Sequence, residues 1–277
     1  VFGLASFLSP LVYALLLKDL SLPAHAQSFL IVVLSRATPA HLPWVSIYWV
    51  FAAGSFAMMT VLAMMPMPAV HRSKDETAGT WDHYRVLLGR KRTWLYFFCI
   101  VAYVGSEQGT ADWMSEYLAR YHGMDPHAQG AQAVAYFWGL LTAGCVAGIV
   151  LLRIVDCRHV LIVFSVGALS MLTLALFGSD AVAQWAFPAI GLFASIMWPA
   201  IFALALNSEA DHHGPFAGIL CTGIMGGALV PLAIGYVGDH YGLRDGMCLL
   251  YLTFGFIFTI GFWARPLVNN ARIGEQA

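Results

Sequence analysis

Polar side chains that could do chemistry interrupt a long apolar stretch over residues 94–118. Glu107 follows Trp94 by 13 residues, and at about 1.5 Å per helical residue this places it a little past the middle of a membrane-spanning helix. A charged group at that depth is costly, so it must face a cavity or a partner. We predict that Glu107 contacts a solute or gates its path. The alternative is a neutral carboxyl that hydrogen-bonds to a neighbouring helix.

Further polar residues follow Glu107 on the same stretch. Gln108 is the next residue and faces another side of the helix. Asp112 and Glu116 lie four residues apart, on one helix face and nearer the end of the span. A solvated rim is the favoured interpretation for these two carboxylates. Gln108 and Asp112 are kept as candidates for solute contact.

Tryptophans inside the apolar stretches are a second kind of candidate. Trp113, Trp138 and Trp198 lie within predicted spans, whereas tryptophans at span ends fit the aromatic belt of a membrane protein. Sugars have C–H faces that pack on aromatic rings and hydroxyls that need amide or carboxylate partners, so a cavity with Trp, Glu, Gln and Asn suits them. The alternative is helix packing for each tryptophan, and a helix-terminating role for Asn207, which lies near a span end.

The elements that must position these residues are membrane-spanning helices. Of the 277 residues, 60% are apolar and 10% are charged, against about half and about a quarter in a soluble domain. Eight apolar runs approach the length needed to cross a bilayer, at residues 1–17, 44–65, 94–118, 133–152, 159–177, 182–206, 215–237 and 247–264. The sequence therefore predicts an all-α membrane protein, with lipids as partners. Its net charge of −1 argues against nucleic acid as a partner.

One long polar stretch, residues 70–93, separates the second and third spans. It carries six Lys and Arg residues, so the positive-inside rule places it in the cytoplasm. With spans alternating outward from it, the inner side collects ten basic residues and the outer side four. The predicted organisation is two helices in residues 1–69, a cytoplasmic linker in 70–93, six helices in 94–264 and a cytoplasmic tail in 265–277.

The seventh predicted span combines glycines with an internal proline. Gly223, Gly226, Gly227 and Gly235 allow helices to approach closely, and Pro231 removes one helical hydrogen bond and permits a bend. Close packing and a hinge are compatible interpretations of this pattern. The sequence has no zinc-protease, nucleophile-elbow or Walker motif. We therefore expect no enzymatic activity, no metal site and no cofactor.

Three segments resemble the fucose:proton symporter family of the major facilitator superfamily, which includes glucose and galactose permeases. They are YVGSEQGTADWMSEYL at 103–118, SIMWPAIFALALNS at 195–208 and GGALVPLAIGYVGDHYG at 226–242. The resemblance covers roughly residues 103–264 and is weaker over residues 3–17. Many members carry Gly-Arg midway along the eighth helix, where this chain has Gly144 and Cys145. A gating contact on the cytoplasmic side is therefore expected to differ.

The resemblance implies a transporter with two six-helix halves and a solute held between them near the midplane. This fragment would supply the last two helices of one half and all of the other. The acidic residues to which proton coupling is ascribed lie in the family's earlier helices, outside this chain. The implied activity is secondary active transport of a sugar or similar small polar solute, coupled to protons. We expect a bacterial inner membrane location with a cytoplasmic C-terminus. The alternatives are an exporter of amphipathic compounds and a nontransporting membrane scaffold or sensor.

Overall fold

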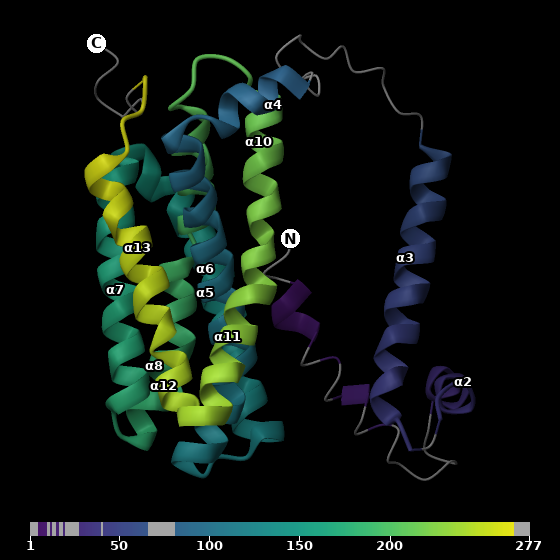
Figure 1. The fold of residues 1–277 in the computed structure, drawn as a ribbon. Helices are drawn as coiled ribbons and strands as arrows, with labels where there is room; N and C mark the ends of the chain where they lie inside the picture. The colour runs from purple at the N-terminus through teal and green to yellow at the C-terminus, as the bar shows by residue number, and fades with distance from the viewer. Residues whose placement is uncertain are drawn as a thin grey trace. The chain divides into compact units, whose positions relative to one another are not determined.

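The structure is a computed structural model that describes residues 5–9, 12, 15–16, 19, 28–39, 41–65 and 81–268 (Figure 1). The chain divides into one unit of residues 5–71 and a second that begins at residue 72 and also includes residues 1–4. Within the described residues every regular element is a helix. The predicted all-α fold is confirmed.

The unit of residues 5–71 contains α2 (Phe29–Ala37), the short 3-10 helix η2 (Pro43–Val45) and α3 (Ser46–Met64). α2, which the sequence analysis did not predict, packs against α3. α3 is the predicted second span, with a mean hydropathy of 1.7. It is apolar on all sides, as expected of a helix that lipid or other helices cover. The predicted first span, residues 1–17, falls largely outside the described residues.

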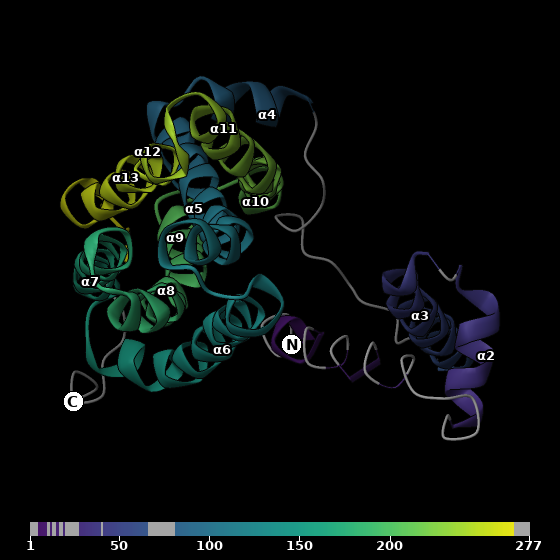
Figure 2. The same ribbon diagram turned by 90° about the horizontal axis from the view of Figure 1, so that it is seen from below.

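In its described residues, the second unit is a bundle of six membrane-length helices, three of which are divided into segments. The continuous helices are α5 (Lys91–His122), α6 (Ala131–Ile154) and α7 (Cys157–Phe177). The divided helices are α8 (Asp180–Ala194) with α9 (Met197–Leu206), α10 (His213–Thr222) with α11 (Gly226–Tyr241), and α12 (Leu243–Met247) with α13 (Leu249–Trp263). Figure 2 looks along this bundle and shows α5 among the other helices, with which it packs extensively.

Six helical stretches of the described residues are long and apolar enough to cross a membrane. One is α3 and the other five lie in the second unit. α5 is long enough as well, with 32 residues, but its charged side chains lower its hydropathy. With α5, seven of the eight predicted spans are helical in the described part of the chain, and the first, residues 1–17, lies largely outside it. The chain is an integral, multi-pass membrane protein.

Glycines allow α5 and α11 to lie close together. A methyl group added at Gly226 would overlap the backbone of Val101, and one added at Gly105 would overlap the side chain of Val230. α10 and α11 are joined by a 3-10 turn, η5 (Gly223–Met225), and Pro231 lies inside α11. The divided helix therefore has a locally different geometry at its middle.

Part of the predicted linker is helical. α4 (Trp81–Leu88) precedes α5, packs against both α5 and α10 (Figure 1), and buries Leu87 completely. The indole nitrogen Nε1 of Trp94 donates a hydrogen bond of 2.8 Å to the carbonyl oxygen of Leu88. Aromatic and aliphatic residues of α4 recur at helical spacing, so one face can be buried although the segment is polar overall.

Candidate functional site

The carboxyl of Glu107 lies inside the bundle and is held by a neighbour on its own helix. Only 8% of Glu107 is exposed. The hydroxyl of Tyr103, one helical turn earlier on α5, donates a hydrogen bond to Oε2 of Glu107. Tyr103 is also buried. The sequence analysis did not single out Tyr103, although its spacing of four residues from Glu107 puts the two side chains on one helix face.

Aromatic rings lie next to one another from Tyr103 on α5 to Trp198 and Phe202 on α9, and we call this row the aromatic wall. The ring of Tyr103 lies 6.0 Å from that of Trp198, and Trp198 in turn stacks on Phe202 at 5.9 Å with an angle of 19° between the ring planes. Tyr103 therefore connects two predicted site residues, Glu107 and Trp198. A carboxyl beside aromatic faces can accept hydrogen bonds from hydroxyls while the rings pack on C–H groups.

A break in the helix that carries Trp198 lies one turn before that residue. Ser195 and Ile196 separate α8 from α9. The thiol of Cys145 donates a hydrogen bond of 3.2 Å to the carbonyl oxygen of Ser195, and Gly144 leaves no room for a larger residue beside Ser195. The position at which this chain departs from the Gly-Arg pattern therefore contacts the break. An arginine in place of Cys145 could not make the same thiol contact.

Asp112 and Trp113 line a different feature, which we call the α5–α11 groove. This groove has a volume of about 470 Å³ and is lined by Asp112, Trp113, Glu116, Arg120, Pro231 and Leu232. Nε of Arg120 lies 2.5 Å from Oε1 of Glu116, and Nε1 of Trp113 donates a hydrogen bond of 3.0 Å to the carbonyl oxygen of Pro231. Trp113 also packs on Gly235, and Gln108 lies against Gly227. The predicted site residues of α5 thus lie in at least two different places. Glu107 is buried inside the bundle, whereas Asp112 and Trp113 line the groove.

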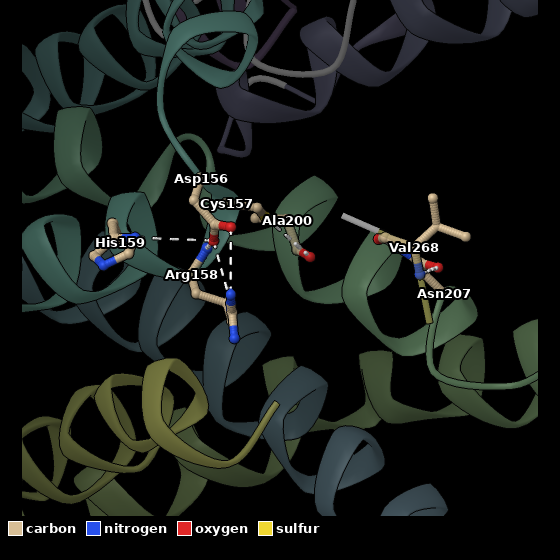
Figure 3. Close-up of polar contacts among 7 residues, drawn as sticks. All are labelled: Asp156, Cys157, Arg158, His159, Ala200, Asn207 and Val268. Carbon is tan, nitrogen blue, oxygen red and sulfur yellow. Dashed lines mark hydrogen bonds and ion pairs between the residues drawn. The ribbon is translucent and has the colours of Figure 1, made fainter. Parts of the chain in front are cut away.

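Asn207 is hydrogen-bonded to the segment that follows α13. Its Nδ2 donates to the carbonyl oxygen of Val268 at 2.6 Å, and its Oδ1 accepts from the amide of Val268 at 3.2 Å (Figure 3). Asn207 follows directly after α9 and also borders a cavity of about 110 Å³ near Cys157.

Trp138, on α6, is 7% exposed and packs edge-on against Phe137.

Asp156 caps the first turn of α7. Its Oδ1 accepts hydrogen bonds from the backbone amide of Arg158 at 2.8 Å and from Nε of Arg158 at 3.2 Å (Figure 3). Burial opposes ionisation of Asp156, but the hydrogen bonds and the charge of Arg158 outweigh it and hold the pKa of the carboxyl below its usual value. These contacts secure the start of a span.

Comparisons with known proteins point to sugar transporters. No family model matches the chain. It is 29% identical over 225 residues to a glucose/galactose transporter of Brucella abortus, which covers 77% of this chain and 52% of that protein. A putative glucose/galactose transporter of Helicobacter pylori is 24% identical over 209 residues, covering 74% and 48%. The chain spans about half the length of these curated relatives.

Solved structures show the same fold. A crystal structure of the Escherichia coli fucose:proton symporter FucP superimposes with a TM-score of 0.68 at 18% identity, covering 92% of this chain and 64% of that one. A second structure of FucP, in the outward conformation, gives a TM-score of 0.67 at 18% identity, with coverage of 91% and 63%. The fold is that of a major facilitator transporter.

Proposed function

We propose that this chain, which has the major facilitator fold and resembles the sugar permeases of that superfamily, forms part of a secondary active transporter for a sugar or similar small polar solute. The observation that carries the proposal is the cluster of Tyr103, Glu107 and Trp198 inside the bundle. A transporter accounts for a buried carboxyl that lipid contact alone would penalise. It is also in line with relatives that are named as transporters, not as enzymes.

In this proposal Glu107 binds solute hydroxyls and Trp198 packs on the C–H face of the solute. Tyr103 holds the carboxyl in place. Asp112 and Trp113 lie further along α5, in the α5–α11 groove, where they meet a solute on its way to or from Glu107. Gln108 and Trp138 remain predicted contacts of the solute. Asn207 instead binds the segment that follows the last helix, through its hydrogen bond to Val268.

Proton coupling is part of the proposal. A carboxyl shielded from water can be neutral in a closed cavity and release its proton when the cavity hydrates. Glu107 has this type of setting, because it is buried with a tyrosine hydroxyl as partner. The similar FucP is described as a proton symporter.

Alternating access would use the divided helices. In transporters of this fold one half rocks against the other around a central site. The break at Ser195–Ile196 and the 3-10 turn η5 are the places where α8–α9 and α10–α11 can change their angle. We further propose a bacterial inner membrane location, with residues 70–93 and the C-terminus in the cytoplasm.

The test is uptake by the intact protein in cells that lack their own sugar uptake. Accumulation of labelled galactose and of labelled glucose would be followed together with alkalinisation of the medium. Wild type should take up at least one of these sugars with protons, and Glu107→Gln should abolish the proton movement. Asp245→Asn is the control, because it also neutralises one carboxylate, at an exposed site on α12 that does not line the α5–α11 groove. Uptake and proton movement unchanged in Glu107→Gln would overturn the proposed role of Glu107.

A further inference from the structure

Several titratable side chains meet where α4 packs on the start of α10, far from Glu107. Arg90, which precedes α5, forms an ion pair with Glu209, whose side chain is only 6% exposed. A ring nitrogen of His213 lies 3.0 Å from the carbonyl oxygen of Glu209. The connection between α9 and α10 is thus fixed to the start of α5. Glu107 is 16 residues further along α5, or about 24 Å along a helix.

A histidine pair joins α4 to the same connection. The imidazole rings of His83 on α4 and His212 before α10 are stacked, with ring centroids 4.2 Å apart and an angle of 25° between their planes. His212 has a φ of 65°, the one positive φ among the non-glycine residues that the structure describes. A side chain makes that left-handed conformation costly. The stack with His83 therefore holds a backbone turn that is unfavourable by itself.

The stack depends on the charge of both rings. Imidazole gains a proton between about pH 5 and pH 8. One neutral ring can stack on a neutral or a charged ring, whereas two imidazolium ions at this separation repel each other. Other charged and titratable groups on α4, the α9–α10 connection and the starts of α5 and α10 are Asp82, Tyr84, Arg85, Arg90, Lys91, Arg92, Glu209, Asp211 and His213. Glu209, the buried carboxylate of this set, is engaged by Arg90.

We propose that His83 and His212 form a proton-operated clasp, which holds α4 on α10 while at least one ring is neutral and releases α4 when both are protonated. α10 is the first segment of a helix that is divided at η5, so α4 rests on one segment of a divided helix. The clasp would make the packing of α4 on α10 sensitive to the pH on the side of the membrane where α4 lies. The inference is independent of the solute proposed for Glu107.

Hydrogen exchange of the backbone amides of α4 tests the clasp in the intact protein in lipid nanodiscs. Protection of residues 81–88 would be compared at pH 7.5 and pH 5.0 after correction for the intrinsic exchange rates, with α7 as internal reference. We expect protection of α4 in wild type to fall about fivefold or more at the lower pH, because charge repulsion at this distance is worth at least that factor. Protection of α4 that does not change with pH would overturn the clasp.

Three variants identify the groups that respond. His83→Phe keeps an aromatic ring but cannot become charged, so α4 should stay protected at both pH values. His212→Asn tolerates the left-handed conformation but removes the ring, so α4 should be poorly protected at both. Glu209→Gln should keep the pH response, because the response is assigned to the imidazoles. A wild-type loss of protection that persists in His83→Phe, or that disappears in Glu209→Gln, would contradict the proposal.

Discussion

The hydroxyl of Tyr103 donates a hydrogen bond to Oε2 of Glu107, and the ring of the same tyrosine faces Trp198 on α9. One side chain thus orients the carboxyl and also links it to the aromatic wall. A buried carboxyl without a partner would be costly, so the tyrosine both stabilises Glu107 and limits where it can point.

Removal of the Tyr103 hydroxyl should weaken solute binding without unfolding the protein. In Tyr103→Phe the ring still packs on Trp198, but the carboxyl of Glu107 loses the hydrogen bond from the hydroxyl. A hydrogen bond to a charged group is worth about 1.5–3 kcal/mol. We expect the KM for uptake to rise about tenfold or more. Tyr136→Phe is the control, because Tyr136 accepts a hydrogen bond from Gln132 at an exposed site. Equal KM values for the two variants would argue against a positioning role for Tyr103.

The close approach of α5 and α11 predicts an unequal response of two glycines to the same substitution. Gly226→Ala would force a methyl group against the backbone of Val101, whereas nothing lies within 4 Å of a methyl group at Gly255. Overpacking costs about 1–3 kcal/mol, and Gly255→Ala should be neutral or stabilise its helix by up to about 1 kcal/mol. Thermal unfolding in detergent measures both. A Gly226→Ala variant as stable as Gly255→Ala would show that the two helices lie further apart.

Asp156 should stabilise the fold in a pH-dependent way. Because its pKa is lowered in the folded protein, the ionised carboxyl contributes stability above the ordinary carboxyl pKa of about 3.9, and this contribution is lost as the pH falls through the lower, folded value. Asp156→Asn should therefore lower the melting temperature at pH 7, and the difference from wild type should shrink toward pH 3. Asp245→Asn, at an exposed site, controls for the loss of one negative charge. A difference that grows on acidification would contradict this assignment.

The proposed topology predicts opposite labelling at two exposed positions. In a cysteine-free background, Val86→Cys on α4 should react with a membrane-impermeant maleimide only after cells are permeabilised. Ala181→Cys at the start of α8 should react in intact cells. The prediction follows from the ten-to-four distribution of basic residues. The reverse pattern would invert the assigned orientation.

The spans within the described residues could be predicted from the sequence, because a long apolar run is what a helix needs to cross a bilayer. Glu107 could be singled out because a carboxylate within an apolar span is costly in lipid. The break at Ser195–Ile196 was not predicted, because the run from 182 to 206 is apolar throughout and a local turn leaves its hydropathy unchanged. α4 was missed because a short, polar helix in a basic loop has no hydropathy signal.

Contacts between residues that are far apart in the sequence could not be predicted from its pattern. Tyr103 could have been found from its spacing to Glu107, but its contact with Trp198 depends on the packing of α5 against α9. The stacking of His83 on His212 likewise joins a linker helix to a connection between two spans. Such pairs follow from the tertiary arrangement and not from local periodicity.

Equilibrium binding of labelled sugar to the purified, intact protein tests the central claim most directly. Wild type, Glu107→Gln and Asp245→Asn would be titrated with labelled galactose and with labelled glucose in nanodiscs, after their folding is checked by thermal unfolding. We expect saturable binding of at least one of the two sugars to wild type and Asp245→Asn, with the Kd for Glu107→Gln about tenfold higher or more, since a hydrogen bond to a charged group is worth about 1.5–3 kcal/mol. Equal affinity of a folded Glu107→Gln variant, or no binding of either sugar to wild type, would contradict the account.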